Sequence, residues 1–211
     1  EWTLKILKFA WPFALWGVFS WLQISSSRWS LEIFCSTNDV GRFAVLYQLG
    51  YVPIGFVLGL FVNLLYPLIY QKAGDATKRT NNLYVGKLIW KITFVTLFAT
   101  SICAYFAYIS NELLFKLLVS NEYREISIYF PLMIIAGGLS ASGQLLSLKL
   151  MSDIKTNHLI FPKIGSSLIG FILSFYCAYY YDLIGVIIAL ILYSLTFFLL
   201  TIYSVLSNSK R

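Results

Sequence analysis

Residues 9–32 read FAWPFALWGVFSWLQISSSRWSLE, an apolar run that becomes polar before it ends. A helix would place four of these residues on one face, because they recur every three or four positions: Trp21, Ser25, Arg28 and Glu32. They span about 16 Å of helix. An ionisable residue inside a membrane span costs roughly 2.5–3.5 kcal/mol and normally faces protein or a wet cavity. We therefore interpret this face as the wall of a water-lined pathway.

The composition around this stretch is that of an integral membrane protein. Of the 211 residues, 59% are hydrophobic and 12% are charged, and the mean hydropathy is +0.75. Soluble domains carry about 25% charged residues. The net charge of +7 arises from basic residues scattered between apolar runs. This placement favours contact with lipid headgroups and argues against nucleic acid binding.

The apolar runs predict an all-α membrane bundle of six transmembrane helices, which forms a single lobe over residues 1–211. Each run reaches the roughly 20 residues needed to cross a bilayer core of about 30 Å. Helices also satisfy the backbone hydrogen bonds within lipid. Pro53 and Pro131 lie inside their runs, where proline favours a kink. The predicted spans are 9–34, 43–70, 87–109, 126–149, 160–181 and 184–205.

The basic residues predict the orientation of this bundle. Twelve lie on one side of the predicted spans and three on the other, with Arg28 within or near the first span. The positive-inside rule then places both termini in the cytoplasm. We expect short outer loops at 36–42 and 110–125, a tight outer turn at 181–185, and a polar inner loop at 71–87. Because the sequence begins with Glu1 and not with Met, we also expect it to be part of a longer protein.

Arg28 has two alternative roles. It snorkels to the outer interface with Glu32 as its partner four residues on, or it points inward and attracts an anion. A guanidinium forms paired hydrogen bonds with phosphate, so the inward role has a clear ligand chemistry. The polar surroundings favour that role, because a snorkelling arginine does not need them: Gln23, Ser25, Ser26 and Ser27.

The second predicted span carries a stripe of polar and small residues: Gln48, Tyr51, Gly55, Gly59 and Asn63. Gly55 and Gly59 form a GxxxG pair, which lets another helix approach closely. Two interpretations stay open. The stripe is a packing face, or Gln48, Tyr51 and Asn63 line the same cavity as Arg28.

The fourth predicted span is rich in small residues between Gly137 and Ser147. Small residues at this density allow tight helix packing or a hinge, and we favour packing. Gln144 lies among them and stays a candidate for hydrogen bonding within a cavity.

The sequence offers no pattern typical of an enzyme or a metal protein. Its cysteines are far apart, it has no CxxC, and His158 is its one histidine. We also find no catalytic triad, paired carboxylates or phosphate-binding loop. We therefore expect neither enzymatic activity nor a cofactor nor a bound metal.

The quoted stretch, FAWPFALWGVFSWLQISSSRW at 9–29, belongs to a wider resemblance that covers most of the chain. It is followed by NDVGRFAVLYQLGYVPIGFVLGLFVNLLYPLIYQ at 38–71 and FPLMIIAGGLSASGQLLSLKLMSDIKT at 130–156. Pro162-Lys163 and GVIIA at 185–189 follow these stretches. The ensemble resembles the second half of Wzx-type polysaccharide and O-antigen flippases, which belong to the MOP (MATE-like) exporter superfamily.

This resemblance implies a protein of two six-helix lobes around a central cavity, in the bacterial cytoplasmic membrane. The present chain would be the C-terminal lobe, partnered by an N-terminal lobe. The substrate would be a polyprenyl-diphosphate-linked oligosaccharide, a unit of O-antigen, capsule or exopolysaccharide. Arg28 would bind the diphosphate and the polar residues would bond the sugar: Gln23, Gln48, Tyr51 and Asn63. The remaining candidates for the cavity wall are Ser25, Ser27, Glu32 and Gln144.

The chain departs from this family at one position. Ser26-Ser27-Arg28 stands where such proteins often carry Ser-Asp-Arg, so an ion-coupled mechanism does not carry over. A cation-coupled drug or metabolite antiporter of the same superfamily is the alternative, and Glu32 is its one candidate for an intramembrane acid. A membrane transferase would need catalytic acids or histidines. A scaffold would leave Arg28 facing headgroups without a cavity beside it.

Overall fold

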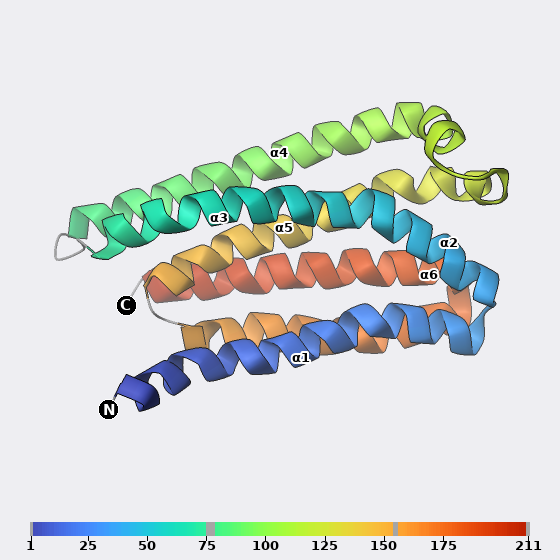
Figure 1. Ribbon diagram of the computed structural model, residues 1–211. Coiled ribbons are helices and arrows are strands. Elements are labelled where there is room, and N and C mark those ends of the chain that lie inside the picture. Colours follow the sequence, from blue (N-terminus) through green and yellow to red (C-terminus); the bar gives the residue numbers. More distant parts are fainter. Residues whose placement is uncertain (1, 75–78, 154–155, 210–211) are drawn as a thin grey trace.

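The computed structural model describes residues 2–74, 79–153 and 156–209, and every regular element among them is a helix. The predicted all-α fold class is thus confirmed. Figure 1 shows long helices that run side by side, with both chain termini at one end. We call this the terminal end and the opposite one the distal end. In chain order the elements are α1 (Trp2–Phe34), α2 (Thr37–Leu46), the π-helix η1 (Tyr47–Tyr51), α3 (Val52–Gly74), α4 (Arg79–Leu118), the 3-10 helix η2 (Asn121–Tyr129), α5 (Phe130–Ser152), the 3-10 helix η3 (Thr156–Leu159) and α6 (Ile160–Ser209).

The longest helix, α6, is a hairpin of two arms. Its backbone leaves the helical region at Asp182, with φ 50° and ψ −136°, a conformation that Asp tolerates better than most side chains. The chain then doubles back, since Phe197 lies over Lys163 and Tyr193 lies against Gly170. Residues 160–181 form the first arm and residues 183–209 the second, drawn in orange and red in Figure 1. The break falls within the predicted turn at 181–185.

Helix α1 runs parallel to the first arm of α6. Three contacts share one offset of 147 residues along the chain: Ser27 with Ser174, Cys35 with Asp182, and Trp16 with Lys163. Because these contacts are spread from Trp16 to the residue after the end of α1, the constant offset means that this part of α1 and the first arm rise together side by side.

Helix α5 is the centre of the bundle. In an apolar 18-residue window of Asn121–Ser152, 72% of the residues are buried, whereas the share is 17% in the corresponding windows of Thr37–Leu65 and Tyr84–Leu118. Its small residues meet three neighbours: Gly138 contacts Thr100 of α4, Gly137 contacts Ile54 of α3, and Gly143 lies under the ring of Phe197. These glycines let the helices approach closely, so the small residues of the fourth predicted span are packing positions.

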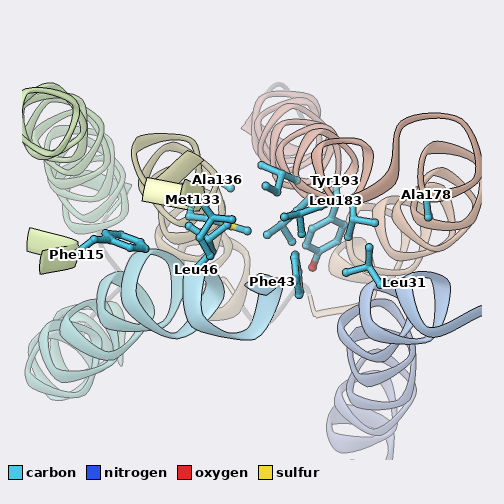
Figure 2. Close-up of a cluster of buried hydrophobic side chains, with 13 residues drawn as sticks. Leu31, Phe43, Leu46, Phe115, Met133, Ala136, Ala178, Leu183 and Tyr193 are labelled. Carbon is cyan, nitrogen blue, oxygen red and sulfur yellow. The ribbon is translucent and has the colours of Figure 1, made fainter. Parts of the chain in front are cut away.

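Two apolar cores hold the bundle. The distal core joins α1, α2, α5 and α6, and Figure 2 shows its side chains converging from these helices. Its members include Leu31, Phe43, Leu46, Met133 and Leu183. The terminal core joins α3, α4, α5 and the second arm, and it includes Leu58, Ile89, Leu146 and Val205. Helix α1 contributes a buried side chain to the distal core, whereas only the partly buried Trp16 reaches the terminal one.

Four described stretches are long and apolar enough to cross a membrane by length and composition: Thr37–Leu65, Tyr84–Leu118, Asn121–Ser152 and Asn157–Ser207. Large apolar side chains are exposed on their outer faces, among them Phe94, Phe98 and Phe106 of α4. Soluble proteins rarely expose apolar surface so densely. The chain therefore has the character of a multi-pass membrane protein. Helix α1, with its polar residues, is not among the four stretches, and the count of six crossings stays a prediction.

The helices extend beyond their predicted bounds. The outer loops expected at 36–42 and 110–125 are wrong, because α2 begins at Thr37 and α4 continues to Leu118. Within the inner loop expected at 71–87, α3 continues to Gly74 and α4 begins at Arg79, while 75–78 lie outside the described residues. Pro131 does not lie inside a helix as predicted, but in the first turn of α5, where its missing N–H needs no partner.

The start of α2 is fixed by a capping box. The Ser36 hydroxyl accepts a hydrogen bond from the Asp39 amide at 3.2 Å, and the Asp39 carboxylate accepts one from the Ser36 amide at 3.3 Å. Replacing Ser36 by alanine should destabilise this helix end by about 1 kcal/mol. We expect faster hydrogen exchange at the amides of 37–40, measured by mass spectrometry. Ser120→Ala is the matched control, since Ser120 precedes η2 without a side-chain capping bond; unchanged exchange in Ser36→Ala would contradict the capping role.

Candidate functional site

Helix α1 has two polar faces where the sequence analysis described one. Gln23, Ser27 and Ser30 are buried, and they face α6. Arg28 and Glu32 are exposed and Ser25 is half-buried. The structure therefore divides the predicted candidates of this helix between a buried interface and an open face.

The buried face is rich in hydroxyl groups. Ser27 Oγ lies 3.5 Å from Ser174 Oγ across the interface with the first arm of α6. Ser26 Oγ donates to the Gln23 carbonyl at 2.6 Å, so that hydroxyl is satisfied within its own helix. The side-chain amide of Gln23 is buried and has no hydrogen-bond partner at its nitrogen or its oxygen among the described residues. A buried unsatisfied polar group costs about 1–3 kcal/mol, which marks this amide as a candidate for function.

A second polar contact crosses the interface between η1 and α5. The Tyr51 hydroxyl donates to Ser140 Oγ at 2.9 Å. Other buried residues with hydroxyl groups lie on α5 and α6: Ser142, Ser167, Tyr193 and Ser194. Together with Gln23 they make up what we call the polar seam, a set of polar groups within an otherwise apolar bundle.

The π-helix η1 positions the aromatic part of the site. Pro53 has no N–H to donate four residues back, and the Val52 amide donates five residues back to the Tyr47 carbonyl. Gly50 lies directly against Met133 of α5, which leaves no room for a side chain. The wider turn stacks the rings of Tyr47 and Tyr51 at 4.8 Å, and Phe43 stacks on Tyr47 at 5.8 Å. Such π segments are frequent at functional sites.

Arg28 lies on the exposed face of α1. The ion pairs among the described residues join Arg42 to Asp39 and Glu125, and Lys149 to Asp153. None includes Arg28 or Glu32, so the pair expected between these two residues is not formed within the described part of the chain, and the exposed side chain of Arg28 leaves both of its roles open.

The candidates of the second predicted span are divided in the same way. Gln48 and Asn63 are exposed, whereas Tyr51 is held by Ser140. No atom lies within 4 Å of the position that a Cβ would take at Gly55 or Gly59. The GxxxG pair thus packs on nothing in the described residues, and whether it receives another helix stays a prediction.

Gln144 is exposed although most of its neighbours on α5 are buried. It lies four residues beyond Ser140, on the same face of the helix. The structure brings Tyr47 beside Tyr51 and brings Tyr51 to Ser140. No described contact joins Gln48, Asn63 or Gln144 to these groups.

Lys163 is the residue that sequence analysis missed. It was counted with the basic residues of the inner side, yet it is 6% exposed. Its Nζ lies 3.9 Å from the ring centroid of Trp16 and 4.3 Å from that of Phe197. The available signal was its position inside the predicted span 160–181, because a charge inside a span is a functional candidate by default.

Comparison of the chain with models of protein families, with curated proteins and with solved structures found no match.

Proposed function

We propose that this chain is one lobe of a flippase that moves a polyprenyl-diphosphate-linked oligosaccharide across the bacterial cytoplasmic membrane. Its six helices act as the C-terminal half of a Wzx-type transporter of the MOP superfamily, with both termini in the cytoplasm. An N-terminal lobe completes the cavity, and the two lobes rock to give alternating access. The chemistry is transport without covalent change to the substrate.

The position of Arg28 carries this proposal. Its side chain is exposed on α1, with no carboxylate within ion-pair distance among the described residues. A free guanidinium presents a planar fork of donors that fits a phosphate. An exposed, unneutralised guanidinium on an otherwise apolar bundle has an anionic ligand as its natural partner.

Polar groups on α1, η1, α3 and α5 suit a sugar. The Gln23 amide, the Tyr51–Ser140 pair and the exposed Gln48, Asn63 and Gln144 offer both donors and acceptors. Tyr47 and Tyr51 add ring faces beside them. The distal core would close the outer end of the pathway in this conformation.

A cation-coupled antiporter is the second candidate, because the exposed carboxylate of Glu32 also has no ion-pair partner among the described residues. A Glu32→Gln variant separates the two: the antiporter loses cation-driven transport, whereas the flippase keeps glycan translocation.

The direct test is translocation in proteoliposomes. The full-length protein is reconstituted with a fluorescent lipid-linked oligosaccharide, and a membrane-impermeant lectin reports the fraction exposed on each leaflet. We expect equilibration between leaflets well above the rate in protein-free vesicles. A rate equal to that of the protein-free vesicles would remove the proposed function.

A further inference from the structure

We propose that Lys163 is a second phosphate-binding cation, held ready between Trp16 and Phe197. This inference rests on the proposed function, because it assigns a further contact to the diphosphate of the same lipid-linked substrate. It concerns a part of the bundle far from Arg28.

The setting of Lys163 is a box made by two helices. Trp16 comes from α1 and Phe197 from the second arm of α6, and the lysine itself lies in the first arm. Phe197 is fully buried against Gly143 of α5, whereas Trp16 is half-buried. The box is therefore rigid on the Phe197 side and open to the outside on the Trp16 side.

The rings stabilise the charge of Lys163 but leave its hydrogen bonds unmade. A cation over an aromatic face gains up to about 2 kcal/mol when it is desolvated. The ammonium also has three N–H donors, and a ring is a poor acceptor for them. Within the described part of the chain, Lys163 has neither a carboxylate within 4 Å nor a hydrogen-bond acceptor. The Lys163 residue is 6% exposed, but its Nζ is not among the fully buried polar atoms that lack a partner, so its donors remain accessible and a phosphate oxygen would satisfy both the charge and the donors.

The box lies towards the terminal end of the bundle, because Lys163 is three residues after the start of α6 at Ile160. Phe197 precedes the end of the predicted span 184–205 by eight residues, about 12 Å of helix. Trp16 precedes Arg28 by twelve residues on α1, about 18 Å towards the terminal end. Lys163 and Arg28 are thus two cations at different depths, and Gln23 of the polar seam lies between their levels.

This arrangement gives the diphosphate two binding positions. Under the predicted orientation, Lys163 receives it on the cytoplasmic side and Arg28 receives it nearer the outer side. The pair would lower the electrostatic cost of an anion within the membrane at both ends of its movement. A merely structural lysine would not require a free set of donors.

The test is binding of farnesyl diphosphate to the full-length protein in nanodiscs, measured by calorimetry. Farnesol is the uncharged control, and inorganic pyrophosphate shows whether the lipid chain contributes. We expect Lys163→Met to weaken diphosphate binding roughly 10- to 100-fold and to leave farnesol unaffected. Lys163→Arg should retain most of the affinity. The matched control is Lys149→Met, because Lys149 is already paired with Asp153 at 2.9 Å and should lose little.

The outcomes separate this inference from the proposed function. Equal diphosphate affinity in the wild type and in Lys163→Met, or no binding by the wild type, overturns the Lys163 site. Weaker binding in Lys163→Met supports it even when glycan translocation is absent, which would overturn the proposed function alone. Unaltered thermal stability of Lys163→Met excludes misfolding as the cause.

Discussion

Replacing Arg28 by alanine is expected to abolish translocation of the lipid-linked glycan while leaving the fold intact. The guanidinium is exposed and takes part in no ion pair among the described residues, so its loss removes no described structural contact of that kind. Hydrogen bonds to a charged group contribute about 1.5–3 kcal/mol each. Loss of a two-bond contact with phosphate should lower the transport rate by at least about 100-fold.

Surface polysaccharide in a strain that depends on the full-length gene measures this effect in cells. Arg28→Lys should keep partial export, because the charge remains and the planar fork is lost. Arg42→Ala is the matched control: Arg42 already pairs with Asp39 at 3.8 Å and Glu125 at 3.5 Å, and we expect export to continue. Normal polymer levels in Arg28→Ala would remove this residue from the mechanism.

The sequence was sufficient for the class of fold and for the approximate place of each long helix. Lipid-compatible backbones must form helices or closed barrels, and the apolar runs lack the alternation of a barrel. The bounds were wrong because hydropathy marks only the apolar part of a helix. Segments with polar and charged residues among the apolar ones, such as 111–118 of α4, continue the same backbone hydrogen bonds beyond that part.

The candidate site was predicted less well, because it depends on which helices become neighbours. The pattern of α1 indicated one polar face, yet the serines around Arg28 belong partly to the interface with α6. Lys163 meets Trp16 only because two helices far apart in sequence are parallel in a fixed register. Nothing in the spacing of Gly55 and Gly59 shows that their face is left uncovered. The periodicity of a sequence shows which residues share one face of a helix, but it does not show which other helix packs against that face.

The second large effect is expected at the turn of the α6 hairpin. A Cβ at Gly185 would overlap the carbonyl oxygen of Cys177 and lie 2.6 Å from its carbonyl carbon. These are backbone atoms of the first arm, so the contact cannot be relieved by rotating a side chain. Gly185→Ala must displace one arm from the other, and we expect a loss of about 3 kcal/mol or more in the free energy of unfolding.

Displacement of the hairpin turn in Gly185→Ala should also affect the end of α1, because the turn contacts the residue that follows this helix. Cys35 Sγ lies 3.6 Å from Asp182 Oδ1, and burial together with the charge of Asp182 raises the pKa of Cys35 to about 11. The thiol therefore stays protonated at neutral pH and donates to the carboxylate. Displacement of the turn in Gly185→Ala should break this contact and make Cys35 react faster with a membrane-impermeant maleimide.

Gly55→Ala provides the matched control for this substitution. It adds the same methyl group to a helical glycine, but no atom lies within 4 Å of the new Cβ. In that open position alanine should be neutral or stabilise the helix by up to about 1 kcal/mol. Heating in detergent followed by size-exclusion chromatography compares the two variants. If Gly185→Ala survived heating as well as Gly55→Ala, the close approach of the two arms at Cys177 would be refuted, and with it the register that places Phe197 over Lys163.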